Sequence, residues 1–265
     1  MTLWSLGLET GVIAVALSVA LTCAWFAEQR TGNASWIDFG WTCAVGLVGV
    51  AVALAPFGSS ASPSRAAMVS ALAMLWGARL AAHLLQRALR GADDPRYVDL
   101  RRQWGADASW RMFWFAQAQA VAAIPLVLAV LLAAHRPGSW PDWQDALGLA
   151  TALMAIAGAA LSDRQLRRFA ADPAHRNKVC DVGFWRWSRH PNYFFEWLGW
   201  VGIAIVAIDA GLGWLAVSAP CHMYWLLVHV SGIPLLEQHM LRSRGGAYRA
   251  YQRTTSPFFP RRPQP

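Results

Sequence analysis

The segment Ser188–Glu196 carries polar side chains whose types and spacing suit ligand chemistry. Asn192 and Glu196 are four residues apart, so a helix that begins at the preceding Pro projects both from one face. A carboxylate one turn inside an apolar helix is costly unless it meets a partner, which makes Glu196 a candidate for ligand binding. The alternative is an ion pair with Arg189 or Arg79 that only joins helices.

A run of basic residues precedes this segment and supplies donors for phosphate oxygens. An adenine dinucleotide phosphate carries a pyrophosphate and a ribose phosphate that need such donors. Asp163 and Arg167 share a helix face, and a weak stabilising helix pair is the simplest interpretation of them. Anionic lipid headgroups are the competing ligands of the same basic residues. These are Arg164, Arg167, Arg168, Arg176, Lys178, Arg186 and Arg189.

Asp38 is an acid between two tryptophans, Trp36 and Trp41, near the start of an apolar run. Tryptophans at the end of a span are usually interfacial anchors. An acid between them equally suits the polar end of an apolar ligand pocket, where burial favours the protonated form. In that hypothesis Asp38 is protonated and donates its proton at neutral pH.

Long apolar helices must position these residues. Of the 265 residues, 56% are hydrophobic, only 14% are charged and 16 are Trp, which is far more apolar than an ordinary soluble domain. Segments of about 20 apolar residues cross a hydrocarbon core of about 30 Å. The sequence therefore predicts an all-α, polytopic membrane helix bundle with about seven transmembrane helices, in a single domain over residues 1–265. The expected spans are Gly7–Ala27, Ser35–Phe57, Ala66–Leu89, Trp110–Ala134, Trp143–Leu161, Tyr193–Ile208 and Gly213–Leu236, with a turn at 209–212 between the last two.

The Lys and Arg residues indicate an orientation. Seven spans place twenty of them on one side and only Arg65 and Arg136 on the other, while Arg79 falls within the third span. The positive-inside rule then predicts a cytoplasmic C-terminus and an outward N-terminus, which suits a bacterial inner membrane. The first apolar run lacks a basic lead and a small-residue cleavage site, so no cleavable signal peptide is expected. Two basic loops, about residues 87–111 and 162–192, and the tail 237–265 are expected on the cytoplasmic side, where the loops bind the cofactor.

Several other function classes are disfavoured. The chain has no G-x-G-x-x-G, G-x-x-x-x-G-K-[ST], H-E-x-x-H or G-x-S-x-G motif. Most of its Trp residues lie in the apolar runs, so the net charge of +8 indicates membrane lipid and a phosphorylated cofactor, with no nucleic acid as partner. The four Cys form no C-x-x-C pair, and neither a disulfide nor a metal site is expected.

Three motifs carry a resemblance to a known family. They are Trp187-Ser188-Arg189-His190-Pro191-Asn192-Tyr193-Phe194-x-Glu196, Ser162-Asp163-x-x-x-Arg167, and Trp76-Gly77-x-Arg79-Leu80 followed by Asp94-Pro95-Arg96-Tyr97. Together they resemble the steroid 5α-reductase superfamily, and within it the bacterial uncharacterised branch grouped with the 3-oxo-5α-steroid 4-dehydrogenases. The likeness covers nearly the whole chain, including Glu237-Gln238-His239 and the tail from Tyr248 to Pro260.

The resemblance implies a seven-helix membrane fold that binds NADPH at its cytoplasmic mouth and delivers hydride to the β-carbon of an enone. The substrate would be a small apolar steroid or sterol-like enone, as in 5α-reduction of a 3-oxo-Δ4-steroid. By this resemblance Asn192 and Glu196 hold the nicotinamide amide, and Asp163 and Arg167 hold the adenosine end. The other expected cofactor-binding residues are Arg79, Arg87, Arg90, Tyr97, Arg168, Lys178, Arg189, His190 and Tyr193.

The substrate end departs from the superfamily pattern. The superfamily uses an acid on the second helix and a Tyr on the third to hold the steroid 3-ketone. Asp38 stands in for the acid, whereas Trp76 occupies the position expected for the Tyr. Asp38 and Trp76 are the expected catalytic residues, and with Trp36 and Trp41 they form the expected substrate site.

Three other functions stay open at this point, and the first is a sterol-isomerase or sterol-reductase specificity within the same superfamily. The sequence Arg-His-Pro-x-Tyr also resembles membrane methyltransferases of the isoprenylcysteine type, which use S-adenosylmethionine, although the long Arg cluster favours a cofactor that bears phosphates. A non-catalytic sterol- or lipid-binding membrane protein would use the Arg loops to hold anionic headgroups.

Overall fold

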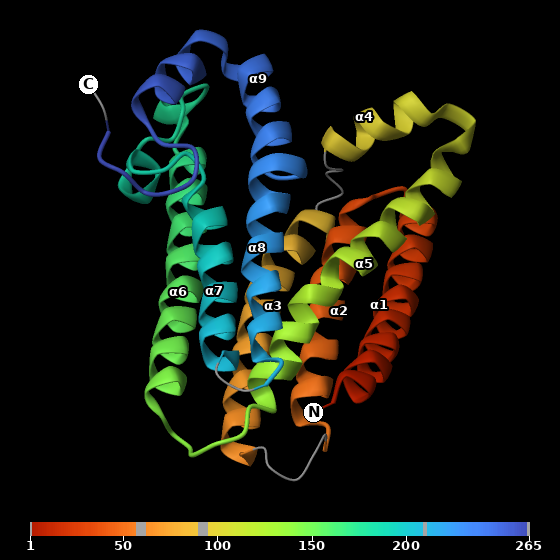
Figure 1. The fold of residues 1–265 in the computed structure, drawn as a ribbon. Helices are drawn as coiled ribbons and strands as arrows, with labels where there is room; N and C mark the ends of the chain where they lie inside the picture. Colours follow the sequence, from red (N-terminus) through yellow and green to blue (C-terminus); the bar gives the residue numbers. More distant parts are fainter. Residues whose placement is uncertain (1, 57–61, 90–94, 209–210, 264–265) are drawn as a thin grey trace. The chain divides into compact units, whose positions relative to one another are not determined.

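In a computed structural model, the chain is described over residues 2–56, 62–89, 95–208 and 211–263, without the side chains of residues 95, 96 and 99. The described residues form helices and no strand, which confirms the polytopic all-α bundle. The helices are α1 (Leu3–Thr31), α2 (Ser35–Leu54), α3 (Pro63–Leu89), α4 (Pro95–Trp104), α5 (Ala108–Ala134), α6 (Trp143–Ala171), α7 (Pro191–Ala207), α8 (Ser218–Trp225) and α9 (Ile233–Thr254) (Figure 1). Short 3₁₀ turns lie at Gly105–Asp107, Pro173–His175, Gly183–Arg186 and Gly213–Val217, and a π-helical turn at Leu226–Val230.

Among the described residues, five helical stretches are long and apolar enough to cross a membrane, and they match the first five expected spans. The sixth expected span corresponds to α7, which has 17 residues. The seventh is divided between a 3₁₀ turn, α8 and a π-helical turn. The total of seven spans stays a prediction. The five stretches are Leu3–Thr31, Ser35–Leu54, Pro63–Leu89, Leu100–Ala134 and Trp143–Ala171.

The chain divides into two compact units. Unit 1 consists of Met1–Leu149 and Ile203–Ala219, and unit 2 consists of Ala150–Gly202 and Pro220–Pro265. The chain passes from one unit to the other within α6, α7 and α8. The expected turn at 209–212 lies partly outside the described residues.

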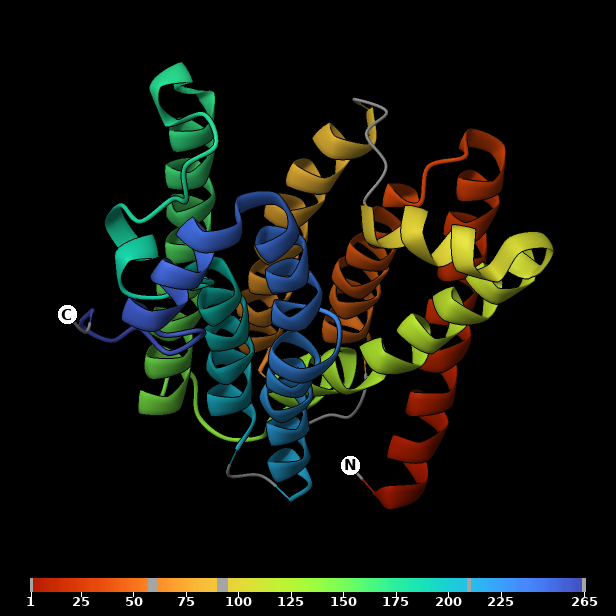
Figure 2. The ribbon, with the colours of Figure 1, turned by 90° about the horizontal axis from the view of Figure 1, so that it is seen from above.

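Unit 1 is a bundle in which α2 packs on α1, α3 and α5 (Figure 2). Two glycines set the closest approach of α2 and α3: a Cβ on Gly77 would lie 3.2 Å from the Cα of Gly46. Small residues at such a crossing let two membrane helices approach through their backbones. The short helix α4 runs across one end of these long helices (Figure 1) and packs against α5.

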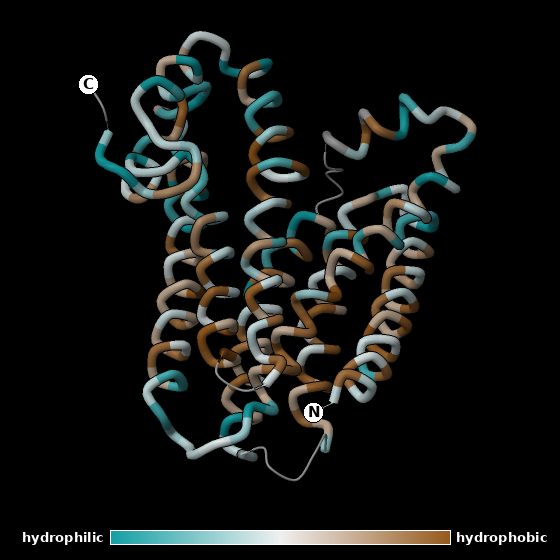
Figure 3. Tube along the Cα trace, in the orientation of Figure 1, coloured by the Kyte–Doolittle hydropathy of each residue, from teal (hydrophilic) through white to brown (hydrophobic). Residues whose placement is uncertain are grey.

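One face of α1 is apolar and exposed. Leu8, Val12, Val15 and Val19 follow a helical spacing and are each more than half exposed. Hydrophobic residues colour most of the length of α1, whereas hydrophilic residues colour much of α4 (Figure 3). Exposure of a continuous apolar stripe of this kind to water is unfavourable, so it is the lipid-facing side of a membrane helix.

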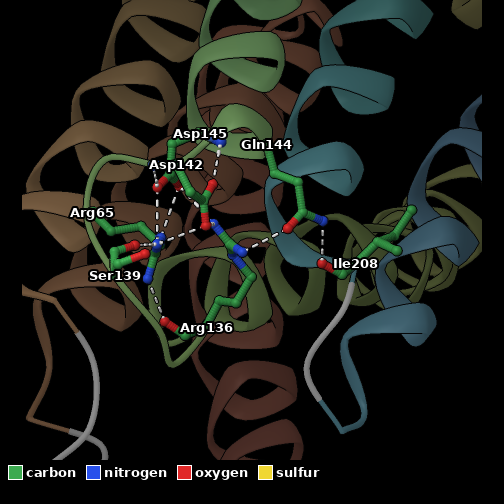
Figure 4. A network of polar contacts seen from close by, with 7 residues as sticks. All are labelled: Arg65, Arg136, Ser139, Asp142, Gln144, Asp145 and Ile208. Carbon is green, nitrogen blue, oxygen red and sulfur yellow. Dashed lines mark hydrogen bonds and ion pairs between the residues drawn. The ribbon is translucent and has the colours of Figure 1, made fainter.

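A polar network joins the start of α3 to the loop between α5 and α6 and to the first turn of α6 (Figure 4). The Arg65 side chain is 0% exposed, and its Nε donates to Asp145 Oδ1 at 2.8 Å. Arg136 donates to Asp142 Oδ2 at 2.6 Å, to Asp145 Oδ1 at 3.1 Å and to Gln144 Oε1 at 2.7 Å. Two Arg and two Asp make this cluster electrically neutral.

The two Arg of this network are the pair that the charge analysis places alone on the sparsely charged side. Both are paired with acids, so neither leaves an unpaired positive charge at this end of the bundle. Arg87, at the other end of α3, follows Arg65 by 22 residues, which is about 33 Å of helix at 1.5 Å per residue. This separation matches the thickness of a hydrocarbon core, and α3 carries a charged cluster at each end of it.

In unit 2, α6 and α7 pack against each other through small residues. The ring of Phe195 occupies the space that a Cβ on Gly158 would fill, and a Cβ on Gly199 would contact Ala155. The loop that follows α6 is held to it by side-chain hydrogen bonds. Trp185 Nε1 donates to the Ser162 carbonyl at 3.0 Å.

Candidate functional site

The first candidate cluster lies in unit 1, around Asp38 at the start of α2. Arg87 Nη2, at the end of α3, donates to Asp38 Oδ2 at 2.7 Å. The Tyr97 hydroxyl, on α4, donates to Asp38 Oδ1 at 2.5 Å. Tyr97 is only 4% exposed, so the short helix α4 brings a buried hydroxyl to the acid. Both carboxyl oxygens of Asp38 are thus in contact with donor groups of other helices, and the expected protonation of Asp38 stays a prediction.

Two of the expected substrate residues line up beside this cluster. Gln119 Nε2 donates weakly to the Tyr97 oxygen at 3.4 Å, and the Gln119 carbonyl accepts from Trp41 Nε1 at 3.1 Å. Trp41 in turn contacts the buried Trp76 edge to face, with ring centroids 6.2 Å apart. A chain of contacts thus runs from Asp38 through Tyr97 to both indole rings.

The other sequence-predicted residues of unit 1 lie on α2 and α3 or outside the described residues. Trp36 lies on α2 and packs edge to face on Phe39. Arg79 is half-buried on α3, three residues beyond Trp76. Arg90 lies outside the described residues.

A second acid fixes α4 in this unit. Glu28, near the end of α1, is 2% exposed and accepts from Arg101 Nη1 at 3.1 Å. Arg101 also donates to the Gly32 carbonyl at 2.9 Å. A buried carboxylate is retained only when it is paired, so this contact ties α4 to the end of α1. It also holds Tyr97, four residues earlier on α4, against Asp38.

The second candidate cluster lies in unit 2, where α6 and α7 meet. Asn192 Nδ2 donates to Asp163 Oδ1 at 3.3 Å, so residues expected at the two ends of the cofactor contact each other. Glu196 is half-buried one turn further along α7. Arg167 and Arg168 are exposed on the last turns of α6. Lys178 is exposed in the following loop.

Arg189 and His190 both contact Glu237 of α9. Arg189 Nε donates to Glu237 Oε1 at 2.7 Å, and His190 Nε2 lies 3.1 Å from the same oxygen. Gln252 Nε2 donates to Glu237 Oε2 at 2.7 Å. Burial of Glu237 opposes its ionisation, but the hydrogen bonds from His190, Arg189 and Gln252 and the charge of Arg189 outweigh burial and lower its pKa to about 2. Tyr193 stacks on the His190 ring, with centroids 5.5 Å apart.

The C-terminal tail is hydrogen-bonded along the start of α7. Arg189 N donates to the Ser256 carbonyl at 2.8 Å, and Ser188 Oγ donates to the Phe258 carbonyl at 2.9 Å. Arg261 N donates to the Trp187 carbonyl at 2.9 Å. Burial raises the pKa of Tyr251, and its protonated hydroxyl donates to the Trp185 carbonyl.

Aromatic side chains complete the attachment of the tail. Phe258 and Phe259 both pack on Trp197 of α7 and Tyr224 of α8. Tail residues therefore form part of the support of α7, the helix that carries Asn192 and Glu196.

Sequence reasoning left three of these contributors out of the candidate site: Glu28, Gln119 and Glu237. Each contacts its partner across a long separation in the chain, so no local spacing signals it. For Glu237 one signal was available, because Glu237-Gln238-His239 is among the residues that carry the resemblance. The roles expected for Arg189 and His190 in cofactor binding stay predictions, and the contacts shown here are with the protein.

Comparisons with known proteins agree with the resemblance at the level of the family. An uncharacterised protein of Schizosaccharomyces pombe is 26% identical to this chain, over 94% of the chain and 79% of that protein. No solved structure matches the chain. A family model described as a protein of unknown function, DUF1295, matches residues 24–255, which extend through both units. The chain therefore belongs to the DUF1295 family, a family of unknown function that is steroid 5α-reductase-like.

Proposed function

We propose that this protein is an NADPH-dependent reductase of the C=C bond of an enone in a steroid-like lipid. The observation that carries the proposal is the part-buried hydrogen bond of 2.5 Å between the Tyr97 hydroxyl and Asp38, together with the nearby contact between the Trp41 and Trp76 indole rings. The Tyr97 hydroxyl supplies the hydrogen-bond donor that polarisation of a ketone requires, and Asp38 orients it. Membership in a steroid 5α-reductase-like family supports the same reaction class.

Tyr97 and Asp38 would act on the substrate carbonyl. A carbonyl oxygen that enters beside Tyr97 accepts the hydroxyl hydrogen in place of Asp38, and negative charge that develops on this oxygen is stabilised by the hydrogen bond. Arg87 holds Asp38 from its other oxygen, so the carboxylate keeps its position while the hydroxyl changes acceptor. Trp41 and Trp76 exclude water from the flat apolar body of the substrate. This mechanism moves the proton-bearing role from Asp38 to Tyr97.

The side chains of unit 2 fit a phosphate-bearing dinucleotide. Arg167 and Arg168 are exposed on the same helix that carries Asp163. NADPH supplies the hydride of the reaction when it is bound. Asn192 and Glu196 would hold its amide, Asp163 and Arg167 its adenosine end, and the surrounding basic residues its phosphates.

A direct experiment tests this function. Protein purified in detergent is mixed with NADPH, excess cofactor is removed, and the absorbance of reduced nicotinamide is followed after addition of a Δ4-3-ketosteroid. We expect retained NADPH and a fall in absorbance with the enone, but not with the matching saturated 3-ketosteroid. A chain that retains no NADPH but binds S-adenosylmethionine would contradict the proposal, and so would one that binds anionic lipid without any cofactor-dependent turnover.

A further inference from the structure

His190 has one satisfied and one unsatisfied ring nitrogen. Its side chain is 2% exposed, and Nε2 contacts Glu237 Oε1 at 3.1 Å. Among the described residues, no hydrogen-bond partner exists for Nδ1, which is also shielded from solvent. Buried polar atoms almost always have partners, so a buried nitrogen without one requires an explanation.

The protonation state of His190 follows from Glu237. Glu237 is ionised at neutral pH, because its pKa is about 2, and an ionised carboxylate can only accept hydrogen bonds. The Nε2 atom must therefore carry the proton of the Nε2–Glu237 hydrogen bond. Burial, the main cause, lowers the pKa of His190 despite the opposing contact with Glu237, so the ring holds no second proton at neutral pH. Nδ1 is then a bare lone pair.

The neighbours of His190 do not satisfy this lone pair. The backbone N–H of His190 donates to Ser188 Oγ at 3.1 Å. Arg189 directs its Nε to Glu237 and its Nη1 to the carbonyls of Gln252 and Thr255. The Tyr193 ring is stacked on the imidazole, so it covers a face of the ring and not the edge that bears Nδ1. The unsatisfied nitrogen lies at the start of α7, two residues before Asn192.

We propose that Glu237 is a positioning residue that fixes His190 as the Nε2–H tautomer, so that His190 Nδ1 accepts a hydrogen bond from a neutral N–H or O–H group of the bound cofactor. This inference rests on the proposed function and gives His190 a defined polarity within it. A phosphate oxygen does not fit Nδ1, because both atoms are acceptors. The carboxamide N–H and the ribose hydroxyls of NADPH are the groups that do fit.

A pair of amide substitutions separates the two ring nitrogens. In His190→Asn the short amide carbonyl takes the place of Nδ1 and keeps an acceptor there, but the contact with Glu237 is lost. In His190→Gln the longer side chain places its N–H near Glu237 but loses the acceptor. We expect His190→Gln to raise the NADPH dissociation constant about ten-fold or more, and His190→Asn to raise it less than about three-fold. His229→Gln, an exposed histidine on the π-helical turn, is the matched control.

The imidazole nitrogens of the wild-type protein report the tautomer directly, and a folded His190 variant serves only to assign their resonances. In protein labelled with ¹⁵N-histidine, the resonances absent from the His190→Gln spectrum belong to His190. We expect one protonated nitrogen and one bare nitrogen without cofactor, and a shift of the bare nitrogen when NADPH is added. A protonated Nδ1, or two protonated nitrogens at neutral pH, would overturn the proposal.

The remaining outcomes distinguish this inference from the proposed function. If the wild-type protein binds no NADPH, the proposed function fails, and a shift of the bare Nδ1 resonance on adding NADPH cannot occur. If NADPH binds but His190→Asn weakens binding more than His190→Gln, the Glu237 contact matters and the acceptor role is wrong.

The acetylpyridine analogue of NADPH lacks the carboxamide N–H. A ten-fold loss in His190→Gln that disappears with this analogue identifies the carboxamide as the donor, and a loss that persists identifies a ribose hydroxyl.

Discussion

Asp38 and Tyr97 are 59 residues apart in the chain, yet the Tyr97 hydroxyl donates to Asp38 Oδ1 at 2.5 Å. The contact joins the first turn of α2 to α4, a helix of ten residues that is polar on average. Propensity alone does not hold so short a helix, so α4 depends on tertiary contacts such as the ion pair between Glu28 and Arg101. The donor of the candidate site is thus positioned by a second acid on another helix.

Removal of the Tyr97 hydroxyl should abolish most of the enone reduction. Tyr97→Phe keeps the ring but removes the donor, so we expect turnover to fall roughly 10²-fold with NADPH affinity little changed. The turnover of the Asp38→Asn variant should fall by a similar factor, because the amide no longer holds Tyr97 as a carboxylate does. Steady-state rates and NADPH titrations of both variants check this.

Tyr224→Phe is the matched control for Tyr97→Phe. Tyr224 packs on Phe258 and Phe259, and the structure shows no hydrogen bond from its hydroxyl to the described residues. Its variant should retain near-normal turnover. Full activity of Tyr97→Phe would mean that another group polarises the carbonyl, and the proposed role of Tyr97 would then be wrong.

Asp145 should be essential for stability at the opposite end of unit 1. It pairs with the fully buried Arg65 and also accepts from Arg136. Asp145→Asn leaves two buried cations with one fewer acid, so we expect a destabilisation of about 3–5 kcal/mol. Thermal unfolding in detergent measures this effect. Asp107→Asn, which breaks only an exposed pair with Arg111 at 3.9 Å, should change stability by less than about 1 kcal/mol.

The same network supports the predicted orientation of the chain in the membrane. Arg65 and Arg136 are neutralised by Asp145 and Asp142, so the side they occupy carries almost no unpaired positive charge. We therefore expect a reporter fused after Pro265 to be cytoplasmic and one fused before Met1 to be on the other side. Accessibility of a reporter to impermeant reagents in intact cells measures this. Both ends on one side would contradict a bundle with an odd number of spans.

The long helices could be predicted from the sequence, because a run of about 20 apolar residues is by itself the signature of a membrane-spanning helix. The start of α7 could also be predicted from neighbouring residues, since Pro191 and the spacing of Asn192 and Glu196 indicate the first turn of a helix. The partners of Asp38 and Arg189 could not be predicted this way. Tyr97 and Glu237 reach them through tertiary packing, and a sequence does not show which of several acids and bases meet.

Glu196 should distinguish a cofactor ligand from a structural ion pair. If it accepts hydrogen bonds from the nicotinamide amide, Glu196→Ala should weaken NADPH binding by about 1.5–3 kcal/mol. If it only pairs with a neighbouring Arg, the substitution strands a buried cation and lowers the melting temperature of the cofactor-free protein as well. NADPH titrations and melting curves of the cofactor-free variant are compared. Unchanged affinity together with a large loss of stability would refute the cofactor role.

The cluster around Glu237 should make unit 2 sensitive to acid in two pH windows. The folded pKa of Glu237 is about 2, against an ordinary value of 4.5, so its contribution is complete above pH 4.5 and is lost as pH falls toward 2. That contribution is at most about 3 kcal/mol. The folded pKa of His190 is also below its ordinary value of 6.5, so protonation of the unfolded chain removes stability as pH falls below 6.5.

Melting temperatures measured as a function of pH in detergent separate the two groups. Wild type should be more stable than Glu237→Gln at pH 7, and the difference should narrow below pH 4.5, because protonation of Glu237 removes what the substitution already lacks. The difference in melting temperature between wild type and His190→Gln should instead change below pH 6.5. There the unfolded wild-type chain gains a proton at His190, so wild type loses stability relative to the variant. A difference between wild type and Glu237→Gln that stays constant from pH 7 to pH 3 would mean that Glu237 is not ionised against Arg189 and His190. In that case the assignment of the His190 proton to Nε2 would lose its basis.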